Sequence, residues 1–191
     1  MEFQHVNAKL FVEGSEAALE PLVPVFHRWI KEKPFEELLL DVADYRHVYR
    51  GPGVIVIGHQ ADYSLDNTDG RLGILYNRKA ALDGTNQDRL KYAVRAALTA
   101  CQKLEDDEKF KRQIHFPGKE IQIFVNDRFI APNNAETRAA FEPELKTFCA
   151  SVFGGAEYSV RYEDNARKRF GATITLSKSI PADQWLANLA A

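Results

Sequence analysis

The sequence has few of the residues and patterns that define specialised classes of protein. Among its 191 residues are only 2 cysteines, 11 glycines and 8 prolines, which excludes a collagen-like or low-complexity chain, and 45% of the residues are hydrophobic, as in ordinary globular proteins. No apolar run approaches the length of a membrane span, and the first residues lack the basic stretch and apolar core of a secretory signal. We therefore expect a soluble protein of the cytoplasm.

An excess of charge of one sign is also missing. Lys and Arg total 25 against 27 Asp and Glu, and both signs are scattered along the chain. A general nucleic-acid binder needs a basic face that displaces counterions from phosphates. We therefore expect neither nucleic acid nor a membrane as a partner. The short basic runs, such as residues 167–169, adjoin acidic residues and are typical of solvated turns and helix ends.

The usual motifs of catalysis and metal binding are absent from the sequence. Cys101 and Cys149 are isolated within apolar helical stretches, which predicts buried thiols and no metal or redox role. The sequence contains no phosphate-binding loop, no nucleophile elbow and no His-Glu-x-x-His zinc motif. Residues 66–70 lack the alternating acids of a calcium loop and are better explained as a turn. We expect no cofactor and no metal, and the sequence leaves open whether the protein is an enzyme.

The first elements expected along the chain are a strand and a helix. Residues 6–13 alternate weakly between apolar and polar side chains, which is typical of a strand. Ser15 is a candidate helix cap, and apolar residues at helical spacing predict a helix that continues to about Glu32. Because Pro21 and Pro24 have no backbone N–H, we expect the first turns to be irregular and the regular helix to begin late.

An antiparallel meander of three strands is predicted next. Residues 38–50, 54–57 and 71–76 have strand patterns, and the turns between them contain residues 51–53 and the Asp69-Gly70 pair. Residues 54–57 are apolar at every position. That pattern is typical of a strand covered on both faces, which predicts a central place in the sheet.

The rest of the chain predicts alternating helices and strands. Thr85 and Asp88 form a capping-box pattern, followed by an apolar stripe that predicts a long helix to about Asp107. The side chain of Arg89 is expected to lie away from that stripe. The later elements expected are a strand over 120–125, a helix over 134–153, strands over 157–163 and 170–177, and a short helix over 181–189.

This order of elements predicts an α+β fold with antiparallel strands and with helices packed on one side. Residues 17–26 and 139–148 are identical at five of ten positions, and each segment lies between strands. We therefore also expect an internal duplication of a βαββ unit. The predicted organisation is a βαβββ unit over 1–84, a connecting helix over 85–113 and a βαββ unit over 114–191, all of which could form one domain.

Polar residues at strand ends form the candidate site. If residues 51–53 close a tight hairpin, Asp44 or Tyr45 lies across from His59, depending on the length of the loop. Counting from the Asp69-Gly70 turn brings Asn77 and Arg78 alongside residues 60–62. In that arrangement His59 is a candidate catalytic base oriented by Asp44, and Tyr45, Asp62 and Arg78 are candidate ligand-binding residues, with Arg78 as the clamp for an anion. The alternative is that these residues are polar only because strands end at the surface.

Two hypotheses for the function follow. The first is a non-catalytic binding or self-assembling protein, such as a homodimer or larger homo-oligomer, because no catalytic signature is present. The second is a small enzyme or ligand-binding protein that uses the His59, Asp44 and Arg78 cluster on an anionic small molecule. The sequence favours the first slightly, and it identifies neither a ligand nor a pathway.

Overall fold

The computed structural model describes residues 1–14, 19–110 and 113–190. Most of its strands form one eight-stranded antiparallel sheet with the order β3-β4-β5-β6-β1-β8-β10-β9, and β2 pairs with β7 beside it. The strands are β1 (Val6–Phe11), β2 (Glu13–Gly14), β3 (Leu39–Tyr45), β4 (Gly53–Gly58), β5 (Ala61–Asp66), β6 (Gly73–Arg78), β7 (Ile114–His115), β8 (Glu120–Val125), β9 (Tyr158–Tyr162) and β10 (Gly171–Leu176). The helices are α1 (Leu22–Glu32), α2 (Asn86–Glu105), α3 (Ala135–Phe153) and α4 (Ala182–Ala190).

Strands from the two halves of the chain meet at the centre of this sheet. β1 pairs with β6 on one side and with β8 on the other, so the halves share one continuous ladder of hydrogen bonds. Within the eight-stranded sheet, each half places its first strand beside its last, β1 beside β6 and β8 beside β10. The α+β class predicted from the sequence is confirmed, and the internal duplication stays a prediction.

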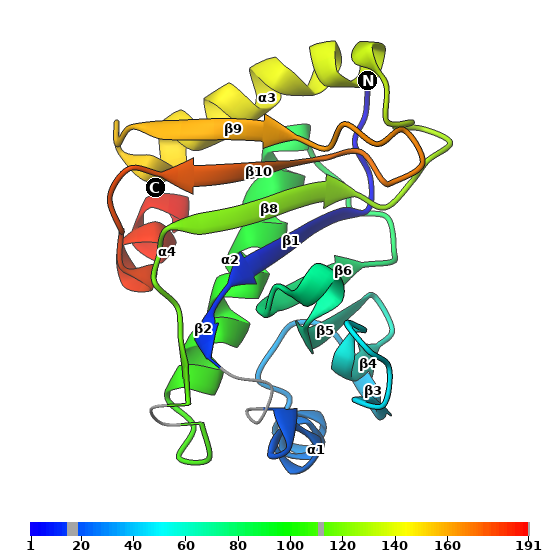
Figure 1. The fold of residues 1–191 in the computed structure, drawn as a ribbon, viewed down its shortest axis with the longest axis vertical. Coiled ribbons are helices and arrows are strands. Elements are labelled where there is room, and N and C mark those ends of the chain that lie inside the picture. The colour runs from blue at the N-terminus through cyan, green and yellow to red at the C-terminus, as the bar shows by residue number, and fades with distance from the viewer. Residues whose placement is uncertain (15–18, 111–112, 191) are drawn as a thin grey trace.

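Helices cover one face of the sheet. α2 packs across β1 and β6, α1 packs under β3 and β4, and α3 and α4 pack beside α2. In Figure 1, α2 lies behind β1 and β8, and the opposite face of these strands is turned to the viewer without a helix over it. The helices described in the structure therefore leave one face of the sheet uncovered.

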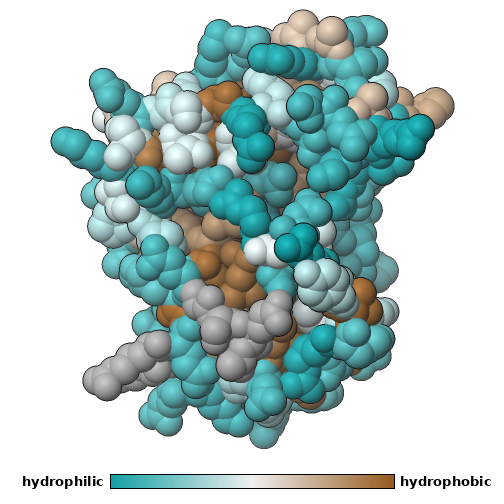
Figure 2. Space-filling model, viewed as in Figure 1, coloured by the Kyte–Doolittle hydropathy of each residue, from teal (hydrophilic) through white to brown (hydrophobic). Residues whose placement is uncertain are grey.

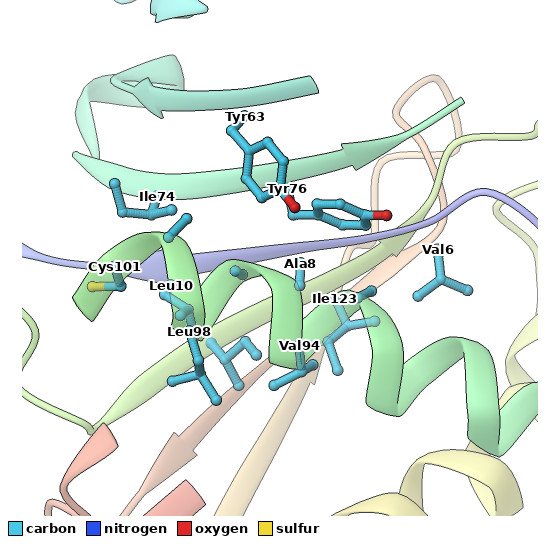
Figure 3. Close-up of a cluster of buried hydrophobic side chains, with 14 of the residues drawn as sticks. Val6, Ala8, Leu10, Tyr63, Ile74, Tyr76, Val94, Leu98, Cys101 and Ile123 are labelled. Atoms are coloured by element: carbon cyan, nitrogen blue, oxygen red, sulfur yellow. The ribbon is translucent and has the colours of Figure 1, made fainter. Parts of the chain in front are cut away.

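Alternation along β1 shows how the two faces differ. Ala8 and Leu10 are fully buried and point towards Val94 and Leu98 of α2, as Figure 3 shows. The intervening residues of a strand point to the opposite face. In β1 that opposite face carries Lys9, which makes the helix-free side of the sheet polar at its centre.

Helix boundaries agree well with the sequence predictions. Thr85 and Asp88 form the predicted capping box of α2, Asn134 caps α3, and α1 ends at Glu32. The regular part of α1 begins only at Leu22, as the two prolines indicated, and the predicted cap Ser15 lies outside the described residues. The expectation for Arg89 was wrong, because its side chain is buried against the carbonyl of Leu82 and the carboxylate of Glu2.

The meander contains one strand more than predicted. β5 is joined to β4 by a turn at His59 and Gln60, and its apolar residues alternate with Asp62, Ser64 and Asp66. Because of these polar residues, the sequence pattern of β5 predicted a loop. β4 is also not central, since it lies next to the edge strand β3, and Ile55 is only half-buried because no helix covers its face.

Candidate functional site

A concave hollow of about 740 Å³ occupies the helix-free face of the sheet. Figure 2 shows this face, with hydrophilic side chains around a small apolar area near its middle. Side chains from both halves of the sheet and from the loops at its ends form the wall. The lining residues include Lys9, Phe11, Asp62, Ser64, Asp66, Asp69, Arg71, Asn77, Gln122, Phe124, Asn126, Arg128, Arg161, Glu163, Lys168, Arg169 and Thr173.

The pair of Lys9 and Asp66 lies at the floor of the hollow. Lys9 is 4% exposed and Asp66 is 3% exposed, and Lys9 Nζ lies 2.5 Å from Asp66 Oδ1. Asp66 also accepts hydrogen bonds from the backbone N–H and the hydroxyl of Thr68. Burial lowers the pKa of Lys9, and the nearby carboxylate of Asp66 opposes that shift only in part. A strongly desolvated charge pair of this kind is costly to bury and is often found at functional sites.

A row of polar residues crosses the sheet beside Lys9. Lys9 lies opposite Gln122 of β8, Gln122 lies opposite Thr173 of β10, and Thr173 lies opposite Arg161 of β9. Residues paired in this way share one face of an antiparallel sheet. The row therefore supplies an amine, an amide, a hydroxyl and a guanidinium to the hollow.

A second polar group surrounds Asn7. Its side chain donates to Asn77 Oδ1 at 2.5 Å and accepts from the backbone N–H of Arg78 at 2.9 Å. Asn77 in turn donates to Asp62 Oδ2 at 3.2 Å, and Lys79 Nζ lies 2.7 Å from Asp62 Oδ1. These bonds fix the orientation of the amides, so the floor of the hollow is preorganised without a ligand.

Three arginines line the part of the hollow that β8, β9 and β10 and their loops form. They come from the loop after β8 (Arg128), from β9 (Arg161) and from the loop before β10 (Arg169). The guanidinium carbon of Arg169 lies 4.4 Å from the centre of the Phe124 ring, and one of its nitrogens donates to Asn126. Within the described residues, none of the three has a carboxylate within 4.0 Å. We call these residues the arginine corner.

The other cations of the rim are paired with acids. Arg71 stacks on Phe11 with 3.7 Å between the guanidinium carbon and the ring centre, and it pairs with Glu120. Lys168 lies 3.3 Å from Asp69 and 3.5 Å from Glu163. The positive charge available to a ligand is therefore concentrated at the arginine corner.

The predicted pairing of His59 with Asp44 or Tyr45 was wrong. Asp44 lies opposite Val54, and Tyr45 lies opposite Gly53, at the start of β4, whereas His59 follows its end. The reason is the connection between β3 and β4, which extends over residues 46–52 where a tight turn at 51–53 was expected. The carboxylate of Asp44 instead pairs with Arg46, which lowers its pKa to about 2 through hydrogen bonding.

The predicted register around Arg78 was right, although Arg78 and Asp62 do not share a site. Ala61 lies opposite Arg78, and Asp62 lies opposite Asn77, as the Asp69-Gly70 turn indicated. Neighbours along a strand point to opposite faces, so Arg78 faces the helices while Asp62 faces the hollow. The guanidinium of Arg78 donates to the carbonyls of Ala80 and Ala81 and is not open to an anion.

Of the residues that the sequence predicted for a site, only Asp62 lines this hollow. Lys9 alternates with apolar neighbours in the sequence, which is also the pattern of an ordinary solvated strand. Arg169 belongs to the basic run that was interpreted as a solvated turn. Only the order of the strands in the sheet, β5-β6-β1-β8-β10-β9, brings these residues to one surface.

A different polar cluster lies on the helix side of the sheet. Glu37 is 5% exposed and accepts hydrogen bonds from the hydroxyls of Tyr63 at 2.8 Å, Tyr76 at 2.9 Å and Tyr92 at 3.1 Å. Burial raises the pKa of each of these tyrosines, and the charge of Glu37 raises it further. Because Tyr92 is on α2 and the other two tyrosines are on β5 and β6, the carboxylate ties the segment before β3 to both layers.

Comparisons with known proteins assign no family to this arrangement. No protein-family model matches the chain, and no curated protein matches its sequence. In the described residues, no group of three histidine, cysteine or acidic side chains is placed to hold a metal ion. No helix in the described part of the chain is long and apolar enough to cross a membrane.

Proposed function

We propose that the protein binds a small anionic molecule in the hollow on the helix-free face of the sheet. The observation that carries this proposal is the arginine corner, in which Arg128, Arg161 and Arg169 stand beside a floor of buried polar side chains without a carboxylate partner among the described residues. A guanidinium offers a planar set of donors that matches a carboxylate or a phosphate. The function is therefore recognition of such a group.

The size and composition of the hollow support a small ligand. Its volume of about 740 Å³ falls within the range of ligand pockets, roughly 300–1,000 Å³. The lining contributes six cationic and four acidic side chains, which leaves a net positive charge before a ligand binds. Phe11 and Phe124 lie under guanidinium groups, so their ring faces are not free to stack on nucleic-acid bases. This geometry favours a compact polar anion.

Titration with pyrophosphate and with citrate tests the proposal, because the two probes carry phosphate and carboxylate groups. Binding is measured by calorimetry and by chemical shifts of the arginine side-chain N–H groups. We expect Arg161→Ala and Arg169→Ala each to weaken binding of at least one probe about tenfold or more. Arg46→Ala is the matched control, since Arg46 is paired with Asp44 on a different part of the surface.

The proposal is overturned if neither probe binds, or if Arg46→Ala weakens binding as much as the two changes at the arginine corner. Circular dichroism of each variant shows whether a lost signal reflects unfolding. Native mass spectrometry of protein purified gently from its host provides a second readout. A small-molecule adduct that is present in the unmodified protein and lost in Arg161→Ala supports the same site.

Self-association through the edge strand β3 is a second candidate function. Large apolar side chains are exposed along β3 and its flanking segments, namely Leu38, Leu40, Tyr45, Val48 and Tyr49. Among the described strands β3 pairs with β4 alone, so no described strand covers its other side. A second copy could pair with this edge. A dimer by native mass spectrometry that dissociates in Leu40→Lys supports this function, and a monomer at all concentrations contradicts it.

A further inference from the structure

The amine of Lys9 differs from the cation of an ion pair in the core, because Lys9 lines the hollow. In the described part of the chain its one hydrogen-bond partner is Asp66, whereas an ammonium group has three donors. Its side chain also borders the hollow and is not sealed within the core. An incoming ligand that reaches the floor of the hollow therefore meets an amine with unused hydrogen-bonding capacity.

Burial alters the chemistry of that amine. Desolvation lowers the pKa of Lys9, so more of its side chain is neutral near pH 7 than for a lysine in water. A neutral amine is the nucleophilic form of lysine, and lysines that react with carbonyl groups are commonly activated in this way. The adjacent carboxylate of Asp66 can accept the proton that the ammonium loses, at a distance of 2.5 Å.

We propose that Lys9 forms an imine with an aldehyde or keto group of the anionic ligand. This inference rests on the proposed function, because the arginine corner holds the anionic group while Lys9 meets the carbonyl carbon. The Lys9 amine lies beside Asp66 of β5, so it points away from Arg161 on β9. Arg169 extends towards β1, because its guanidinium carbon lies 4.4 Å from the ring centre of Phe124, which is opposite Asn7, two residues before Lys9. We place a short oxo acid between the Lys9 amine and Arg169.

The reaction needs no oxidant, reductant or further reactant. The Lys9 ammonium passes a proton to Asp66, and the amine nitrogen attacks the carbonyl carbon, forming a C–N bond as the π bond of the carbonyl breaks. A proton then moves from that nitrogen to the carbonyl oxygen, which gives a carbinolamine. The carbinolamine loses its hydroxyl group as water, with a proton returned from Asp66. The products are the protonated imine and one water molecule, and hydrolysis reverses the step.

Reductive trapping with glyoxylate tests the inference. Glyoxylate carries an aldehyde beside a carboxylate, and sodium cyanoborohydride reduces an imine to a stable secondary amine. The folded protein is treated near neutral pH, and the modified lysines are located by peptide mapping. We expect Lys9 to be carboxymethylated about tenfold or more faster than Lys146, whose side chain is 69% exposed.

Variants identify the source of the reactivity. Lys9→Arg keeps a cation beside Asp66 but cannot form an imine, so the fast modification should be lost. Lys9→Met serves the same purpose if the arginine does not fit. Arg169→Ala should slow the modification of Lys9 without affecting that of Lys146.

The outcomes separate this inference from the proposed function. If pyrophosphate or citrate binds but Lys9 is modified no faster than Lys146, the imine is wrong and anion binding stands. If Lys9 is modified rapidly in a folded protein that binds neither anion, and Arg169→Ala has no effect, the amine is reactive but the anion site is wrong.

Discussion

Lys9 reaches Asp66 by crossing over Gly73 of the intervening strand. β6 lies between β1 and β5, and Gly73 pairs with Phe11 on one side and with Asp66 on the other. A Cβ atom at Gly73 would lie 2.9 Å from Lys9 Cε and 2.6 Å from the carbonyl oxygen of Leu10. Because Gly73 has no side chain, the side chain of Lys9 can cross β6 and pair with Asp66.

Removing one partner of this pair should destabilise the protein strongly. Lys9→Met leaves the Asp66 carboxylate buried without its cation, at an expected cost of about 3–5 kcal/mol in the free energy of unfolding. Lys168→Met is the control, because Lys168 pairs with Asp69 at the exposed rim and should contribute less than about 1 kcal/mol. Urea unfolding measures both, and equal effects would show that the Lys9 pair is solvated.

Gly73→Ala should destabilise the protein by about 1–3 kcal/mol, the usual cost of overpacking. The reason is the close approach of the new methyl group to the Lys9 side chain and to the backbone of β1. Part of that cost should disappear in the Lys9→Met background, since a methionine is not bound to Asp66 and its side chain is free to move away from the new methyl group. A double-mutant cycle by urea unfolding measures this coupling, and strictly additive effects would mean that the backbone contact alone causes the loss.

Glu37→Gln should destabilise the protein by about 1.5–3 kcal/mol, the range for a hydrogen bond to a charged group. The amide replaces one acceptor oxygen by a donor, so it cannot satisfy all three tyrosine hydroxyls that Glu37 binds. Glu36→Gln is the matched control, because Glu36 is exposed and accepts a hydrogen bond only from Tyr92 in the described structure. The melting temperature should fall far more in Glu37→Gln than in Glu36→Gln, and similar melting temperatures of the two variants would contradict the prediction.

Alkaline pH should destabilise the protein through the same cluster. The folded pKa values of Tyr63, Tyr76 and Tyr92 lie above the ordinary value of 10.0, because of burial and the charge of Glu37. Since the unfolded chain releases these protons first, the stability that they contribute is full below about pH 10 and is lost as the pH rises above it. Tyrosinate absorbance should appear for these residues together with unfolding. Their ionisation in the native protein near pH 10 would contradict the prediction.

Local sequence determined the boundaries of most elements. The capping box at Thr85 and Asp88 and the glycine after Phe153 determine where α2 begins and α3 ends, because these signals act within one helical turn. The Asp69-Gly70 turn likewise predicted that Asn77 and Arg78 lie alongside residues 60–62, and in the structure Asp62 is opposite Asn77 and Ala61 is opposite Arg78. Such features were predictable because the interacting residues are close in sequence.

The register of the edge strand β3 against β4 could not be predicted from local sequence. The connection over residues 46–52 is too long for its turn residues to determine the register of β3, so the predicted contact between Asp44 and His59 was wrong. β5 was missed because Ser64 and Asp66 are polar, although both are buried in the folded chain. Periodicity cannot distinguish a polar residue that lines a hollow from one that faces bulk water.

The sequence by itself thus determined the α+β class, the helices and most strands, through patterns that span a few residues each. Only the tertiary structure decided which face of the sheet the helices cover and which charges meet on the other face. Lys9, Asp66 and Arg169 come from distant parts of the chain and meet at the hollow. Asp62 and Arg78 lie on neighbouring strands, but their side chains face opposite sides of the sheet. The hollow exists because the described α-helices pack on one side, which leaves these polar side chains uncovered.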